Sequence, residues 1–81
     1  MGYHKRTISV KGNFGEVSKI EEELDELKEA LEQDNKILAL VEISDLYGAI
    51  EAVAENLGIN MEDVKKMSAA TKRAFQSGER K

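Results

Sequence analysis

The segment from residue 36 to residue 56 is apolar around most of a helical circumference, and this feature restricts the possible folds most strongly. A surface helix has one apolar stripe, whereas this segment leaves only a narrow polar strip between its leucine, isoleucine and valine side chains. Such a helix needs cover on several sides. Because a chain of 81 residues has few other elements, we expect an all-α protein, a short helical bundle that a second copy completes.

Amphipathic helices are expected on both sides of this segment. Apolar residues at three- and four-residue intervals predict one helix from 16 to 33 with an amphipathic stripe, and Ser18 is a possible cap of a late start. A third helix begins after Asn60, a good N-cap, and ends at Gly78. The stripe of the first helix consists of Val17, Ile20, Leu24, Leu27 and Leu31.

The remaining segment lies at the N-terminus. Residues 1–15 hold a β-branched stretch followed by Gly12 and Gly15, which predicts an extended arm or short strand and then a turn. The expected division is therefore an arm over 1–15 and one helical domain over 16–81.

Composition excludes several classes of protein. The chain has no cysteine and one histidine, so disulfides, thiolate metal sites and a histidine-built zinc site are ruled out. No apolar run reaches the ~20 residues of a membrane span and no signal segment is evident, which favours a cytoplasmic protein that does not contact a membrane. Residues 12–59 carry 13 acids and 3 lysines, a charge of −10, which argues against a nucleic-acid surface.

Two carboxylates are out of place in the apolar segment. Glu42 and Asp45 share an arc with Ala49 and Ala52 rather than with the polar strip. Ionised carboxylates there cost several kcal/mol unless they are paired or bind a metal. A structural ion pair is one explanation, but Lys36 is the only basic residue of the segment.

The preceding helix supplies a second acidic group. Glu22, Glu23 and Glu26 flank its apolar stripe, whereas Asp25 and Glu29 are expected to face solvent. The sequence thus contains Glu-x-x-Glu, fifteen residues, and Glu-x-x-Asp. Carboxylates three apart project from one helix face, and two antiparallel helices can bring both pairs together. Converging carboxylates repel each other, and a hard divalent cation such as Mg²⁺ or Mn²⁺ relieves that repulsion.

This pattern resembles the signature of the MazG-like all-α nucleoside triphosphate pyrophosphohydrolases. The resemblance covers about residues 14–75 and includes the basic segment 72–80. It implies a Mg²⁺-dependent enzyme that cleaves an NTP or dNTP to the monophosphate and pyrophosphate, with Mn²⁺ as a possible substitute. It also implies roles for individual residues. The metal ligands would be Glu23, Glu26, Glu42 and Asp45, and the catalytic residues would be Glu22, beside the ligands, and Glu23.

Substrate contacts are assigned in the same way. Lys72 and Arg73, with Lys11 in the arm, are the candidate phosphate-binding cations. Phe14 and Tyr47 are candidates to stack on the base, although packing is the favoured explanation for both. The expected assembly is a homodimer with a four-helix core, or a homotetramer. The alternative function is a non-catalytic helical oligomerisation or interaction module, since the first stripe would also suit a partner helix.

Overall fold

The computed structural model describes residues 11–78, which form three helices and no strand. They are α1 (Val17–Glu32), α2 (Lys36–Asn56) and α3 (Met61–Ser77). The prediction of an all-α protein is confirmed. Within the described residues, no helix is both long enough and apolar enough to cross a membrane.

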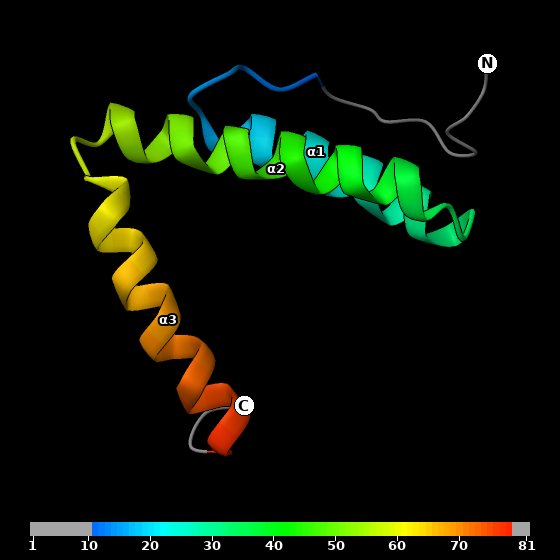
Figure 1. Ribbon diagram of the computed structural model, residues 1–81. Helices are drawn as coiled ribbons and strands as arrows, with labels where there is room; N and C mark the ends of the chain where they lie inside the picture. Colours follow the sequence, from blue (N-terminus) through cyan, green and yellow to red (C-terminus); the bar gives the residue numbers. More distant parts are fainter. Residues whose placement is uncertain (1–10, 79–81) are drawn as a thin grey trace.

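Helices α1 and α2 form an antiparallel hairpin and lie side by side along most of their length (Figure 1). The turn between them is short because Asp34 adopts a left-handed conformation, φ 53°. Asn35 then caps α2, its side chain accepting a hydrogen bond from the Leu38 N–H at 3.0 Å. This tight connection sets the Glu-x-x-Glu segment of α1 opposite the Glu-x-x-Asp segment of α2.

The end of α2 turns the chain sharply. The Ile59 N–H donates to the Ala54 carbonyl at 2.8 Å, and the N–H of Gly58, φ 74°, donates to the Glu55 carbonyl at 3.0 Å. These two bonds form a Schellman motif, in which a glycine in the left-handed conformation ends the helix. Asn60 then caps α3 as predicted, and α3 projects away from the hairpin at a steep angle (Figure 1).

The segment before α1 is tied to the hairpin by polar contacts. The Glu16 N–H donates to the Asn13 carbonyl at 2.9 Å, which closes a turn, and Asn56 donates to the Gly15 carbonyl at 3.0 Å. Ser18 does not cap α1. Glu16 holds the N-cap position, and the Ser18 hydroxyl instead accepts from the Asn13 N–H at 3.1 Å. Residues 1–10 of the expected arm lie outside the described residues.

The buried apolar residues of the described chain are all alanines, such as Ala30, Ala49 and Ala52. The stripe of α1 is not covered within one chain, since Leu24 is 40% and Leu31 62% exposed, and its packing in a two-chain core stays a prediction. Periodicity identified the stripe but could not tell which face meets α2. That face carries carboxylates and alanines instead, and the large apolar side chains remain uncovered.

Candidate metal centre

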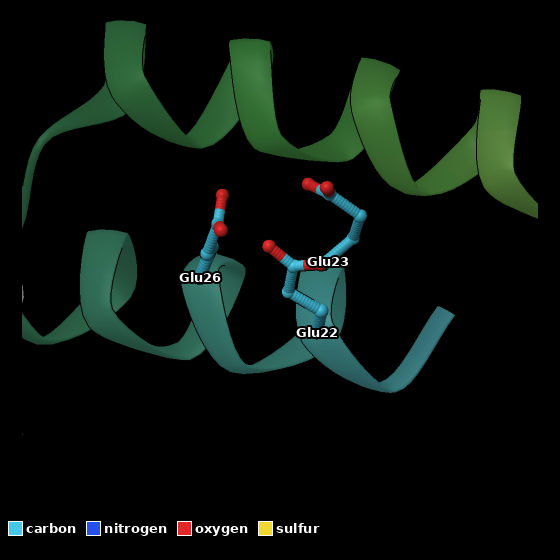
Figure 2. Close-up of side chains that lie close together, drawn as sticks. All are labelled: Glu22, Glu23 and Glu26. Carbon is cyan, nitrogen blue, oxygen red and sulfur yellow. The ribbon is translucent and has the colours of Figure 1, made fainter. Parts of the chain in front are cut away.

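Five carboxylates meet between α1 and α2. Oxygen atoms of Glu22, Glu23 and Glu26 lie within 4.8 Å of one another, and so do oxygen atoms of Glu23, Glu42 and Asp45. Figure 2 shows Glu23 and Glu26 extending from α1 toward α2. Glu23 belongs to both groups and joins them. We refer to these five residues as the acid cluster; it contains every carboxylate that the sequence singled out.

Most of the acid cluster is shielded from solvent. Glu22 and Glu23 are each 6% exposed and Glu42 is 7% exposed, whereas Asp45 lies at the surface. Within the described part of the chain, Glu23 Oε1 and Glu42 Oε1 are buried without a hydrogen-bond partner. A buried, unpaired carboxylate oxygen is costly, and a bound cation removes that cost. The donors are all carboxylate oxygens, so the residues fit a hard divalent ion such as Mg²⁺.

The proximity of these acids changes their protonation. Burial, with the nearby charges of Glu23 and Glu42, raises the pKa of Glu26 to about 7. Burial also raises the pKa of Glu42, helped by the charges of Asp45 and Glu23, while a hydrogen bond with Glu26 works in the opposite direction. Both shifts express the same repulsion among carboxylates brought close together in a partly dry site.

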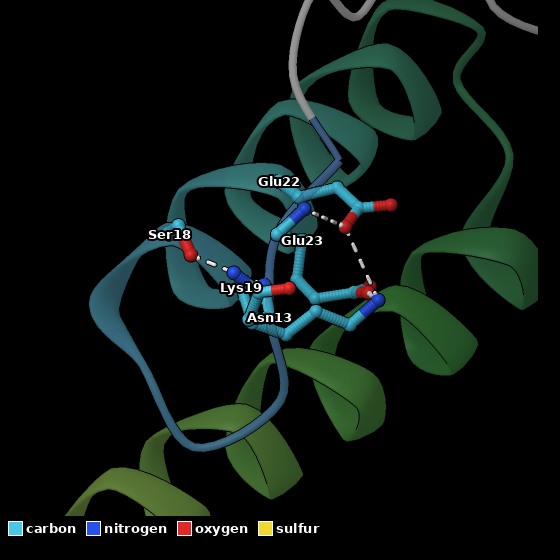
Figure 3. Close-up of polar contacts among 6 residues, drawn as sticks. Asn13, Ser18, Lys19, Glu22 and Glu23 are labelled. Atoms are coloured by element: carbon cyan, nitrogen blue, oxygen red, sulfur yellow. Dashed lines mark hydrogen bonds and ion pairs between the residues drawn. The ribbon is translucent and has the colours of Figure 1, made fainter.

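Glu22 stands in a different environment. Its Oε1 accepts a hydrogen bond from the Gly12 N–H at 2.8 Å and lies 3.2 Å from Lys19 Nζ. The Gly12 hydrogen bond, followed by the Lys19 contact, lowers the pKa of Glu22. A Cβ on residue 12 would collide with the backbone of Lys19 and Ser18. Glycine is therefore required for this close approach. Figure 3 shows Glu22 with Lys19 and the contact between Asn13 and Ser18.

Lys19 was not identified from the sequence. Its ammonium lies 3.2 Å from Glu22 Oε1 and 3.1 Å from Glu23 Oε2, and the hydrogen bonds with Glu23 and Glu22 raise its pKa. The signal was present, because lysine three and four residues before two glutamates places all three on one helix face. Glu29 was also misjudged. It is 1% exposed rather than facing solvent, because it lies on the flank where the buried Glu22 lies.

Of the candidate substrate-binding residues, one lies near the acid cluster within one chain and two line a separate hollow. Tyr47 and Lys72 line an open hollow of about 520 Å³ between α2 and α3. Tyr47 is two residues beyond Asp45, so the two side chains leave α2 on nearly opposite sides. Lys11 is exposed, but after the Gly12 hydrogen bond and Lys19 its charge also lowers the pKa of Glu22. Arg73 is exposed and Phe14 is 74% exposed.

The candidate functional site is defined by this geometry and by the sequence pattern. The acid cluster combines four features: convergence from two helices, burial, unpartnered oxygens and one lysine at its edge. Together they describe a candidate divalent-cation centre with an exposed opening at Asp45. Comparisons with protein-family models, with curated proteins and with solved structures found no match to this chain.

Proposed function

We propose that this protein is a Mg²⁺-dependent nucleoside triphosphate pyrophosphohydrolase that converts an NTP or dNTP and water to the monophosphate and pyrophosphate. The observation that carries the proposal is that Glu23 and Glu42, whose carboxylates come within 4.8 Å of each other from two helices, each keep a buried oxygen with no hydrogen-bond partner among the described residues. A protein does not gain stability from such a pair unless something binds it. The sequence resemblance to MazG-like enzymes supplies the reaction type.

The residues of the acid cluster have two proposed roles, cation binding and proton acceptance. Glu23, Glu26, Glu42 and Asp45 would hold the cation, which supplies charge neutralisation for the triphosphate when bound. Glu22 is held in place by the Gly12 N–H and Lys19. Its lowered pKa keeps it ionised, so it can accept the proton of the attacking water.

We also propose that the working unit is at least a homodimer. On each helix, the apolar residues are turned by about the same angle away from the side that meets the other helix. In an antiparallel pair, equal turns of this kind bring both sets to the same side of the hairpin. The apolar residues of α1 and the large apolar residues of one side of α2 therefore lie on one surface. They remain largely uncovered in one chain, and we call this surface the apolar face. It consists of Ile20, Leu24, Leu27, Leu31, Ile43, Tyr47 and Ile50.

The exposed apolar side chains support this assembly. Leu24, Leu31 and Ile43 are 40%, 62% and 53% exposed in one chain, and a contiguous apolar surface of this kind is typical of a protein interface. Two hairpins packed through their apolar faces would make a four-helix core, and we propose that Lys72 contacts nucleotide only in this assembled protein. Light scattering that shows a folded monomer at micromolar concentration would contradict the assembly.

The function is tested by incubating the protein with a panel of NTPs and dNTPs in Mg²⁺ and resolving the products. We expect the monophosphate and pyrophosphate, and no turnover in EDTA. Release of phosphate and the diphosphate would refute the proposed cleavage position. The alternative, a non-catalytic interaction module, is favoured by the exposed apolar face, and it predicts no hydrolysis of any nucleotide together with metal-independent stability.

A further inference from the structure

The two carboxylate oxygens of Glu23 have different surroundings. Oε2 lies 3.1 Å from the Lys19 ammonium, whereas Oε1 is buried without a hydrogen-bond partner in the described residues. Glu23 is the residue shared by the two groups of the acid cluster. The Lys19 ammonium thus compensates the negative charge of one half of the cluster, and the other half is uncompensated. Glu23 belongs to both halves.

The compensated half is the side of Glu22. Glu22 Oε1 receives the Gly12 N–H at 2.8 Å and the Lys19 ammonium at 3.2 Å. Lys19 is itself only 26% exposed, so water screens this contact less than it would screen a contact on the open surface. One full positive charge, on Lys19, therefore already contacts Glu22 and Glu23 (Figure 3).

The uncompensated half lies on the side of α2. Glu42 Oε1 is buried and unpartnered, and no ion pair with a lysine or arginine within the described range 11–78 involves Glu42, Asp45 or Glu26. Glu23, Glu42 and Asp45 bring their oxygens within 4.8 Å of one another. This half has the oxygen donors of a cation site, and no lysine or arginine between residues 11 and 78 forms an ion pair with it.

We propose that Lys19 is a built-in counter-ion that occupies the Glu22 side of the acid cluster, directs the divalent cation to Glu23, Glu42 and Asp45, and limits each chain to one tightly bound ion. The inference rests on the proposed function only in treating the cluster as a cation site. Because Lys19 already contacts Glu22 and Glu23, its positive charge would repel a divalent cation bound on the same side of this partly dry site. The same ammonium removes the need for a second metal ion between Glu22 and Glu23.

The test is a calorimetric titration of the intact protein with Mn²⁺. The parent is expected to bind one tight Mn²⁺ per chain. Lys19→Met keeps most of the side-chain stem and deletes the charge, so it should bind a second Mn²⁺, or bind the first on the order of tenfold more tightly. Lys19→Arg should behave like the parent. Lys28→Met, an exposed lysine of the same helix, is the matched control and should change neither value.

A second pair of variants keeps Lys19 in place, in case Lys19→Met does not fold without metal. Glu22→Gln can still accept the Gly12 hydrogen bond and should leave tight Mn²⁺ binding within about threefold, since this side is not where the ion is held. Glu42→Gln should weaken it on the order of a hundredfold, because one ligand charge is lost. Circular dichroism at each metal concentration establishes that the variants are folded.

The outcomes separate this inference from the proposed function. Unchanged or weaker Mn²⁺ binding by folded Lys19→Met, or equal losses in Glu22→Gln and Glu42→Gln, would overturn the role of Lys19 alone. Failure of the parent and of Lys19→Met to bind any Mn²⁺ would overturn both the inference and the metal-dependent function. A parent that binds one Mn²⁺, a tighter Lys19→Met and no hydrolysis of any nucleotide would leave Lys19 as proposed and refute only the enzyme.

Discussion

The two sides of the α1–α2 hairpin reverse the usual distribution of residues in a small protein. Between the helices and on one flank, glutamates are buried, whereas on the apolar face leucine, isoleucine and tyrosine are exposed. Burying charge and exposing apolar surface both cost free energy. Neither is explained by the stability of a single chain, and we therefore propose a different occupant for each side: a cation between the helices and a second copy on the apolar face.

The largest effect is expected from charges on the apolar face. Leu24→Glu combined with Ile43→Asp should abolish assembly and lower the melting temperature by more than about 15 °C, because two side chains lose roughly 2 kcal/mol of burial each. Size-exclusion chromatography with light scattering and thermal denaturation measure both effects. Ile37→Asp is the matched control, since Ile37 is 77% exposed on another side of α2. A dimeric, stable double variant would show that this face is not the interface.

The next effect concerns Glu42. Glu42→Gln should reduce turnover at least about a hundredfold and remove most of the Mg²⁺-induced rise in melting temperature. Without metal, the same variant should keep its stability or gain about 1 kcal/mol, because one repelling charge has gone. Asp45→Asn should behave alike, and Glu51→Gln is the control on the polar strip of α2.

If Glu42 instead belongs to a structural ion pair, the outcome is reversed. Loss of one partner would then leave a buried charge and cost roughly 3–5 kcal/mol. Denaturant titration in EDTA, alongside a turnover assay, distinguishes the two accounts. A Glu42→Gln protein that unfolds readily without metal contradicts the metal centre.

A smaller effect is expected from pH. The pKa of Glu26 is raised from 4.5 to about 7 by burial and by its neighbours, and that of Glu42 is raised as well. Such groups bind protons more tightly in the folded state, so the metal-free protein should lose stability as the pH rises from 4.5 to 7. We expect a loss of about 1–3 kcal/mol across this window. Unfolding in EDTA at several pH values measures it, and stability that rises over the same window would refute the repulsion.

The smallest effect is expected from the turn that joins α1 and α2. Asn35→Ala removes the side-chain acceptor for the Leu38 N–H, which should cost about 1 kcal/mol of stability. Both sides depend on the same hairpin, so assembly and metal binding should be retained at 25 °C. Chemical denaturation gives the first quantity and Mn²⁺ titration the second. A selective loss of metal binding would mean that the turn positions the acids directly.

The sequence predicted the helices well because their signals are local. Lys36–Asn56 has the predicted bounds, since a cap before it and Gly58 after it mark the ends through short-range backbone bonds. The acid cluster was also predictable, because helical spacing and an antiparallel turn are enough to bring Glu23 near Glu42.

Tertiary choices were less predictable. The periodicity of the α1 stripe reports only that its residues share a face, and not which partner covers that face. Burial of Glu29 and the approach of Gly12 to Glu22 depend on how separate segments meet. Lys19 was missed because a lysine near acids is usually a solvated pair, and only the burial of Glu22 and Glu23 shows otherwise.

The central claim is that the acids between α1 and α2 hold a divalent cation, and anomalous scattering from crystals grown with Mn²⁺ tests it most directly. The account predicts a strong anomalous peak between the helices, about 2.1–2.4 Å from carboxylate oxygens of Glu23 and Glu42. Crystals at saturating Mn²⁺ with no peak among Glu23, Glu42 and Asp45, or with a lysine or arginine nitrogen in that position, would contradict it.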